Sequence, residues 1–231
     1  MPIKRTYAAH GDACATSHAM ELLGDRWTYP VLRELMLGPK RFFELQAALR
    51  GITPAVLTAR LRELQRYGLV RRVRLPAPAS AAGYAVTDWA AELRPVFESL
   101  GRWALRSPVR DITGCGLTPD AIVQSMLTMA PRRHMDPPLD IALHLSDTRI
   151  GGNAPVSRFR LRWARDLSIE RGPARSPQAI VTGDSSTWTA VLYQDLGLDA
   201  VDIAGDIAAV ERLVGAFDGV LEAATEPVAA S

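Results

Sequence analysis

Cysteine, aromatic residues and long hydrophobic runs are all scarce in this chain. It has 2 cysteines in 231 residues, which excludes a fold stapled by disulfides and favours a reducing compartment. No apolar run approaches the roughly 18–20 residues of a membrane-spanning helix. The first ten residues also lack the apolar core of a secretory signal. We therefore expect a cytoplasmic globular protein with no membrane partner.

The chain also lacks the motifs on which common catalytic sites are built. We find no glycine-rich phosphate loop, no nucleophile elbow and no pair of carboxylates at a convincing spacing. Asp184 and Asp206 each precede a helical pattern, where an aspartate typically caps the helix. We therefore expect no enzyme, no cofactor and no resident metal.

Acidic and basic residues nearly balance, but they are unevenly distributed. The formal net charge is +2. Residues 1–106 hold 16 Lys or Arg and 9 Asp or Glu, whereas residues 107–231 hold 11 and 16. This split is expected where only the first half faces phosphates. Residues 107–116, SPVRDITGCG, are the predicted linker between a domain over 1–106 and a second domain over 117–231.

A helix with an unusual outer face is predicted to begin at Thr53. Thr53 can cap the helix, and Pro54 fits its first position. Leu57, Leu61 and Leu64 form the inward stripe, so small residues and arginines occupy the opposite face. Such a face can approach a DNA major groove closely, although a solvated helix with ordinary arginines is the alternative. The outward candidates are Ala55, Thr58, Arg62 and Arg66.

Two short strands are predicted after this helix, over residues 70–75 and 83–87. The first is rich in arginine, which favours contact with DNA phosphates. The candidates for phosphate contact are Lys40, Arg41, Arg71, Arg72 and Arg74. Residues 88–106 then read as a long helix that Asp88 caps, and Pro95 should bend this helix or mark its true beginning.

A set of motifs over residues 12–106 resembles one family. The motifs are Cys14, Gly24-Asp25-Arg26-Trp27, Leu32-Arg33-Glu34-Leu35, Gly38-Pro39-Lys40-Arg41-Phe42, Ile52-Thr53-Pro54, Leu57-Thr58-Ala59-Arg60-Leu61 and Gly68-Leu69-Val70-Arg71-Arg72. Together they are similar to the HxlR branch of winged helix-turn-helix regulators, which is related to MarR regulators.

The resemblance implies a dimeric transcription regulator that binds a near-palindromic DNA operator. Each recognition helix would lie in a major groove, and the wing would reach the backbone or the minor groove. The helix over 88–106 would build the dimer interface together with the N-terminal segment. The wing tip over residues 76–83 departs from the family because it has no basic residue. This departure argues against insertion of the tip into the minor groove.

The pattern after the linker is a helix, antiparallel strands and then helices, which predicts an α+β fold for the chain. Residues 139–146 and 157–163 alternate apolar and polar side chains, as half-buried strands do. Residues 179–184 and 201–206 repeat a phrase of strand, glycine and aspartate before a helix. This phrase resembles the closing half of a sterol-carrier-protein fold. The resemblance implies a curved antiparallel sheet with helices and an apolar tunnel for a lipid-like molecule.

Large apolar side chains of the second domain are the candidate ligand contacts. Trp163 and Trp188 are the best two, because they are large and lie on elements that face the expected tunnel. An aromatic or methionine residue at helical spacing is more often plain core. The whole candidate set is Met126, Met129, Phe159, Trp163, Trp188, Leu192, Tyr193 and Phe217.

Cys14 is the candidate for a redox response. It precedes a predicted short helix, and some members of the resembled family sense oxidants through a cysteine at this position. A buried or idle thiol is the alternative. His10, Cys14 and His18 are spaced by four residues and could align metal ligands on one helix face. Gly11 weakens that helix and no fourth ligand is evident, so we expect no metal site.

The sequence therefore predicts a homodimeric DNA-binding transcription regulator with an apolar small molecule as effector. Repression is favoured over activation because steric occlusion needs no contact with polymerase. The second domain could instead have kept its fold for dimer support only. Two alternatives for the whole chain also stay open. One is a lipid or small-molecule carrier whose basic domain is a tether, and the other is a redox-sensing regulator that uses Cys14.

Overall fold

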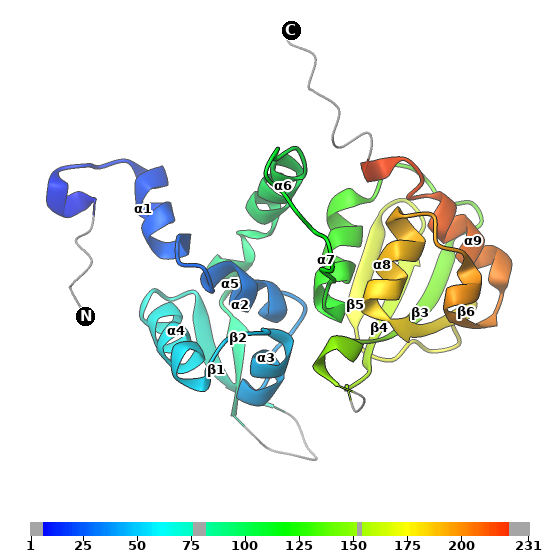
Figure 1. The fold of residues 1–231 in the computed structure, drawn as a ribbon, viewed down its shortest axis with the longest axis horizontal. Coiled ribbons are helices and arrows are strands. Elements are labelled where there is room, and N and C mark those ends of the chain that lie inside the picture. Colours follow the sequence, from blue (N-terminus) through cyan, green and yellow to red (C-terminus); the bar gives the residue numbers. More distant parts are fainter. Residues whose placement is uncertain (1–6, 76–81, 152–153, 222–231) are drawn as a thin grey trace, which may run out of the picture. The chain divides into compact units, whose positions relative to one another are not determined.

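The computed structural model describes residues 7–75, 82–151 and 154–221 and divides into two compact units (Figure 1). The units are Met1–Leu93 and Arg94–Ser231. This division precedes the expected linker at 107–116, and the linker stays a prediction. Most of the expected wing tip and the start and end of the chain lie outside the described residues. No helix in the described part combines the length and apolarity needed to cross a membrane.

The first unit is mostly helical and carries one hairpin. Its core is made mainly of leucines from the helices, including Leu32, Leu45 and Leu61. The elements are η1 (Ala8–His10), α1 (Ala15–Leu23), α2 (Thr28–Leu35), α3 (Phe42–Ala48), α4 (Pro54–Arg66), β1 (Val70–Arg74), β2 (Ala82–Val86) and α5 (Asp88–Ala91).

Both ends of α4 are fixed by local interactions. The Thr53 hydroxyl accepts a hydrogen bond from the Val56 N–H at 3.3 Å, and Pro54 fills the first turn. At the other end, Gly68 has a φ of +73°. The Leu69 N–H then donates to the Leu64 carbonyl at 2.9 Å, which completes a Schellman motif. The predicted helix and its buried leucine stripe are confirmed.

The wing strands pair antiparallel, from Val70 opposite Val86 to Arg74 opposite Ala82. The expected single helix over 88–106 is instead two helices, α5 and α6 (Arg94–Leu105). Pro95 stands in the first turn of α6 and cannot supply the N–H that a continuous helix needs. The cap of α5 is Thr87, whose hydroxyl accepts from the Ala90 N–H at 3.2 Å, so Asp88 is the first helical residue and not the cap.

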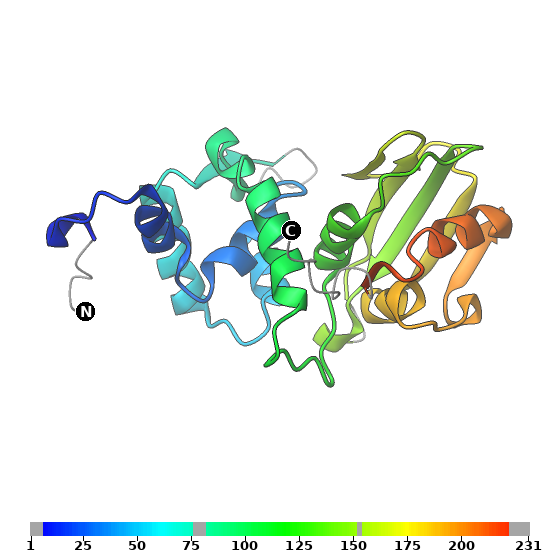
Figure 2. The ribbon, with the colours of Figure 1, turned by 90° about the horizontal axis from the view of Figure 1, so that it is seen from above.

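The second unit places helices on one face of a five-stranded sheet, as seen from above in Figure 2. The apolar side chains of its strands alternate with polar ones, and the apolar set faces the helices. The elements after α6 are α7 (Pro119–Met129), β3 (Leu139–Ser146), η2 (Thr148–Ile150), β4 (Ser157–Trp163), β5 (Leu167–Arg171), β6 (Ala179–Asp184), α8 (Ser185–Tyr193), η3 (Leu198–Ala200), β7 (Asp202–Gly205) and α9 (Ile207–Gly215).

The sheet is mixed and not antiparallel as expected. Its strand order is β5-β4-β3-β6-β7, and β3 and β6 run parallel. The chain forms the meander β3-β4-β5 and then returns to the start of β3. There the Gln178 N–H donates to the Asp140 carbonyl at 2.8 Å, and the Asp140 N–H donates to the Gln178 side chain at 2.9 Å. These bonds align the start of β6 with the start of β3.

The repeated phrase before α8 and α9 has the capping role that the sequence predicts. The Asp184 carboxylate accepts from the Ser186 N–H at 2.8 Å, and Asp206 accepts from the Ala209 N–H at 3.2 Å. Burial raises the pKa of Asp184, but its hydrogen bonds outweigh that effect and hold the pKa below its ordinary value. Both carboxylates therefore serve the fold as helix caps.

Candidate functional site

The outer face of α4 is small in its first turns and cationic in its last turns. Pro54, Ala55, Arg62 and Arg66 are exposed, and Thr58 is half-buried. Small side chains let a helix approach a base edge closely, and a guanidinium can donate two hydrogen bonds in one plane. This face is therefore suited to entering a major groove.

The two arginines of this face differ in how firmly they are held. Arg62 has no ion-pair partner among the described residues and is free to contact a ligand. The Arg66 guanidinium lies over the Tyr67 ring at 4.6 Å and is 3.7 Å from Glu63. Arg66 is thus partly oriented and partly neutralised, so Arg62 is the better candidate for reading bases.

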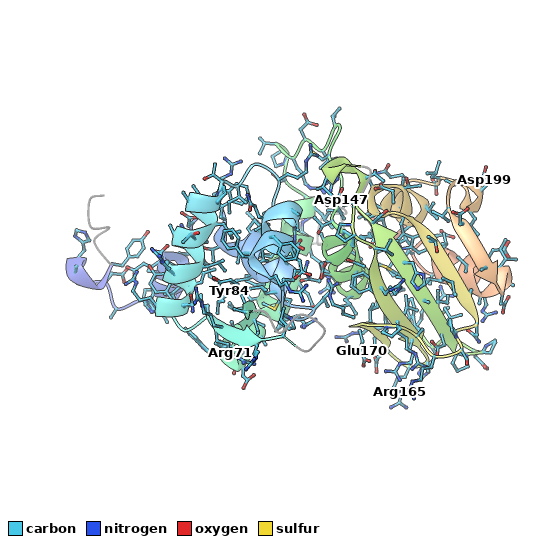
Figure 3. All side chains as sticks on the ribbon, turned by 90° about the horizontal axis from the view of Figure 1, so that it is seen from below. Arg71, Tyr84, Asp147, Arg165, Glu170 and Asp199 are labelled. Carbon is cyan, nitrogen blue, oxygen red and sulfur yellow. The ribbon has the colours of Figure 1, made fainter. Side chains whose placement is uncertain are left out.

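The hairpin β1-β2 forms a cationic wing beside α4. Arg71, Arg72 and Arg74 are all exposed on β1. The Arg72 guanidinium lies over the Tyr84 ring at 5.7 Å and reaches the Tyr84 hydroxyl at 3.4 Å. Figure 3 shows Arg71 and Tyr84 on the two strands of this wing. Three exposed guanidinium groups on one short strand favour binding of a polyanion.

Lys40 does not fit the expected role of a phosphate contact. Lys40 is only 9% exposed, and its ammonium lies 2.6 Å from the carboxylate of Glu34, which is fully buried. The Arg33 guanidinium donates to the same carboxylate at 3.0 Å. Lys40 also pairs its backbone with Tyr84. Its charge is therefore used inside the unit, a role that sequence reasoning missed.

The other basic candidates also show local partners. Arg41 lies 3.9 Å from Glu44, and its guanidinium sits over the Phe43 ring at 5.8 Å. Arg60, which lies nearer the buried side of α4, forms ion pairs with Glu63 and with Asp25. Arg60 thereby ties α4 to the turn before α2.

Comparison with known proteins identifies the family of the segment that holds these elements. Residues 22–109 match the HxlR-like helix-turn-helix family. The HTH-type transcriptional regulator YvaP of Bacillus subtilis (strain 168) is 34% identical over 86 residues, which cover 37% of this chain and 80% of that protein. YodB of the same organism is 36% identical over 86 residues, covering 37% of this chain and 77% of YodB. The chain belongs to the HxlR-like helix-turn-helix family.

Solved structures of relatives cover less than half of this HxlR-like regulator. The reduced form of the Bacillus subtilis regulator YodB is 32% identical and covers 42% of this chain and 97% of that chain, with a TM-score of 0.39. The redox regulator HypR in its oxidized form is 26% identical and covers 43% and 100%, with a TM-score of 0.38. The family assignment rests on sequence identity. The relatives are transcription regulators of a non-enzymatic family.

The eight candidate ligand contacts of the regulator lie between the sheet and the helices of the second unit. Most are fully buried, and several touch one another. The Trp163 and Phe217 rings meet edge to face at 5.8 Å, and the Tyr193 and Phe217 rings at 5.9 Å. The Tyr193 hydroxyl is 3.2 Å from the Ser125 hydroxyl, while burial raises the pKa of Tyr193 to about 12. The structure thus brings the candidates together as tightly packed side chains.

Trp188 has a buried polar group whose hydrogen-bonding capacity is unused. Its side chain is 0% exposed, yet its indole N–H has no hydrogen-bond partner in the described part of the unit. Trp163, by contrast, donates its indole N–H to the Arg133 carbonyl at 3.1 Å. A buried donor without an acceptor costs about 1–3 kcal/mol. Among the candidates, Trp188 would therefore gain most from a bound molecule whose acceptor atom takes the indole hydrogen bond.

A cavity of about 220 Å³ lies elsewhere in the second unit. It is bordered by the segment between α7 and β3 and by the last turn of α9, and none of the eight candidates lines it. The lining residues are Arg133, His134, Met135, Asp136, Arg212 and Gly215. This cavity is polar and cationic, a feature that sequence reasoning missed because its two walls are distant in the chain.

Cys14 is exposed and stands at the residue immediately before α1. The pKa of its thiol lies below the ordinary value, chiefly because the Ser17 backbone N–H stabilises the thiolate. The considered metal alignment does not form, because His10 ends η1 and Gly11 has a φ of +79°. Within the described residues, no cluster of three or more metal-ligating side chains occurs.

Proposed function

We propose that this HxlR-like regulator is a homodimeric repressor that binds a near-palindromic operator through α4 and the wing. The exposed face of α4 carries the proposal. Ala55 and Arg62 lie on that face, and its opposite side is anchored by leucines with almost no exposed surface. A rigid helix with a small and cationic outer face meets the geometric needs of a recognition helix.

The wing arginines supply the proposed contacts to the DNA backbone. Arg71, Arg72 and Arg74 would neutralise phosphates beside the groove that α4 enters, and Arg66 would assist. The part of α4 that enters the major groove would be lined by Thr53, Pro54 and Thr58. Lys40 is left out of this proposed set because of its buried ion pair, and Arg41 stays at its edge.

The proposed dimer forms through apolar stripes that the chain leaves exposed. On α6, Val96, Leu100 and Trp103 recur at helical spacing, and Trp103 is 68% exposed. On α1, no residue is buried and Met20 is exposed. Exposed apolar surface of this kind is typical of protein interfaces, and two-fold symmetry would match a palindromic operator.

The second unit is proposed to sense an apolar small molecule in a sterol-carrier-like layer between sheet and helices. The capped repeat at Asp184 and Asp206 and the unsatisfied Trp188 indole support this proposal. Ligand binding would change DNA affinity by favouring one arrangement of the reading heads over another.

We expect native mass spectrometry of the purified chain to show a dimer that carries an apolar molecule. The variant Trp188→Phe keeps the ring and removes the indole N–H, so it should retain less of that molecule. A dimer without ligand, or equal retention by Trp188→Phe, would contradict the proposed use of this layer. The DNA-binding proposal would be untouched by either result.

The substitution Arg62→Ala should weaken operator binding by about 1–3 kcal/mol and relax sequence preference at one base pair per half-site. The matched variant Arg62→Lys keeps the charge but loses the bidentate hydrogen-bonding geometry of the guanidinium. It should bind unrelated DNA as well as the native protein does and still discriminate poorly. The measurement is a fluorescence anisotropy titration with operator and scrambled duplexes at fixed salt.

The two Arg62 variants separate base contact from phosphate contact. If Arg62→Lys recovers both affinity and discrimination, Arg62 touches phosphate and not a base edge. If Arg62→Ala binds the operator like the native chain, the proposed recognition face is wrong. Thermal unfolding of both variants is the control. It should match the native chain, because Arg62 is exposed and its loss should not affect the fold.

A redox response through Cys14 is the second candidate function, favoured by the lowered thiol pKa at the start of α1. A lower pKa raises the thiolate fraction at neutral pH, and the thiolate is the reactive form. We therefore expect iodoacetamide to modify Cys14 faster than Cys115, which is exposed in the same molecule and serves as an internal control. Mass spectrometry of timed samples gives both rates, and equal rates would remove the chemical basis of this candidate.

A further inference from the structure

The cavity beside α9 is built from two distant parts of the chain. Arg133, His134, Met135 and Asp136 come from the segment before β3, and Arg212 comes from the last turn of α9. The cavity of about 220 Å³ is below the roughly 300–1,000 Å³ of pockets for drug-sized ligands. It therefore suits a smaller molecule.

The segment that forms one wall is fixed to the core of the unit. The Trp163 indole donates to the Arg133 carbonyl at 3.1 Å, and the Met135 N–H donates to the Ala164 carbonyl at 2.8 Å. Both Trp163 and Met135 are buried. The wall is thus held in place before any ligand arrives, which reduces the ordering cost of binding.

The two arginines of the cavity form no ion pair within the described part of the chain, unlike many arginines of the same unit. Arg149, Arg160 and Arg171 each form an ion pair with an aspartate. Among the described residues, no carboxylate lies within ion-pair distance of Arg133 or Arg212, although Asp136 lines the same cavity. The Arg212 Nε is fully buried and has no hydrogen-bond partner among the residues that the structure describes. Two guanidinium groups that border one cavity without a carboxylate partner would stabilise an anion bound between them.

The charge of the lining indicates which anion fits. Two guanidinium groups and one carboxylate leave one positive charge when His134 is neutral. The Met135 side chain and Gly215 add apolar surface. A singly charged organic acid matches this lining better than a doubly charged phosphate does.

We propose that this cavity binds a small organic monocarboxylate, whose carboxylate accepts hydrogen bonds from Arg212 and Arg133. This proposal deepens the sensing role proposed for the second unit, on which its regulatory meaning rests. It adds a second ligand, an acid held beside α9, at a site separate from the buried aromatic layer that is proposed to hold the apolar effector. An uncharged apolar molecule would leave both guanidinium groups of the cavity without an anionic partner.

The test is calorimetric titration of the full chain, without DNA, with sodium acetate, sodium benzoate and inorganic phosphate as probes. We expect one benzoate site per chain. Arg212→Met should weaken benzoate binding about tenfold or more, because a hydrogen bond to a charged group is lost. The control Arg158→Met should bind benzoate like the native chain. Arg158 is exposed near the start of β4, whereas Trp163, which holds the cavity wall through Arg133, is at the end of that strand.

Several results would overturn the proposal. These are binding of neither carboxylate, unchanged benzoate affinity in Arg212→Met, or tighter binding of phosphate than of benzoate. Arg212→Met should melt no lower than the native chain, because the Nε that it removes has no partner to lose. DNA binding is measured separately by anisotropy without benzoate. A chain that binds benzoate but not DNA supports the cavity and contradicts the regulator, and the converse result contradicts only the cavity.

Discussion

Replacing Lys40 with methionine is expected to lower the free energy of unfolding by about 3 kcal/mol, the lower end of the range for breaking a buried ion pair. The Glu34 carboxylate is 0% exposed and would lose the ammonium that lies 2.6 Å away. The effect stays at the lower end because Arg33 still donates to the same carboxylate at 3.0 Å. Urea unfolding followed by circular dichroism measures the change.

Two matched variants show whether the loss comes from the ion pair. Arg71→Met removes one exposed positive charge from the same unit and should leave unfolding unchanged. The double variant with Lys40→Met and Glu34→Leu removes both charges and should recover much of the lost stability, because no fully buried charge remains. Arg33 also loses the Glu34 carboxylate, but its side chain is 21% exposed and can reach water. If Lys40→Met is as stable as the native chain but shows a weaker salt dependence of DNA binding, Lys40 contacts phosphate after all.

Lys40 illustrates what a sequence pattern can and cannot establish about a site. A basic residue after a glycine-proline turn looks like a phosphate contact, because the sequence gives its charge but not its neighbours. Glu34 stands on the buried side of α2, where a helical pattern predicts an apolar residue. The α4 face was predictable because its leucine stripe, cap and terminating glycine are all local signals.

Features that depend on distant segments were predicted less well. The parallel pairing of β3 and β6 is fixed by the contacts of Gln178 with Asp140, and a glutamine before a strand carries no such signal in the sequence. The cationic cavity likewise needs Arg133 and Arg212 from separate elements. The caps at Asp184 and Asp206 were predictable, because a cap involves only residues within one helical turn.

Replacing Arg71, Arg72 and Arg74 together with alanine should reduce the salt dependence of DNA binding more than any single change. Each lost phosphate contact lowers the slope of log affinity against log salt by about 0.9. Three lost contacts should therefore shrink the affinity ratio between 50 mM and 200 mM salt by about 40-fold. Affinity at low salt should fall for operator and unrelated DNA alike, because phosphates carry no sequence information. Anisotropy titrations over a salt series give both quantities.

The proper control changes the net charge equally without touching the wing. Alanine at Arg158, Arg165 and Arg175 removes three exposed charges from the second unit. If the control flattens the salt slope as much as the wing variant, attraction to DNA depends on overall charge, as expected for a carrier with a basic tether. If only the wing variant does so, phosphates meet β1 itself. In that case the β1-β2 hairpin, which pairs with Lys40 and lies beside α4, also positions α4 so that Arg62 reaches the bases. A basic tether would not require this arrangement.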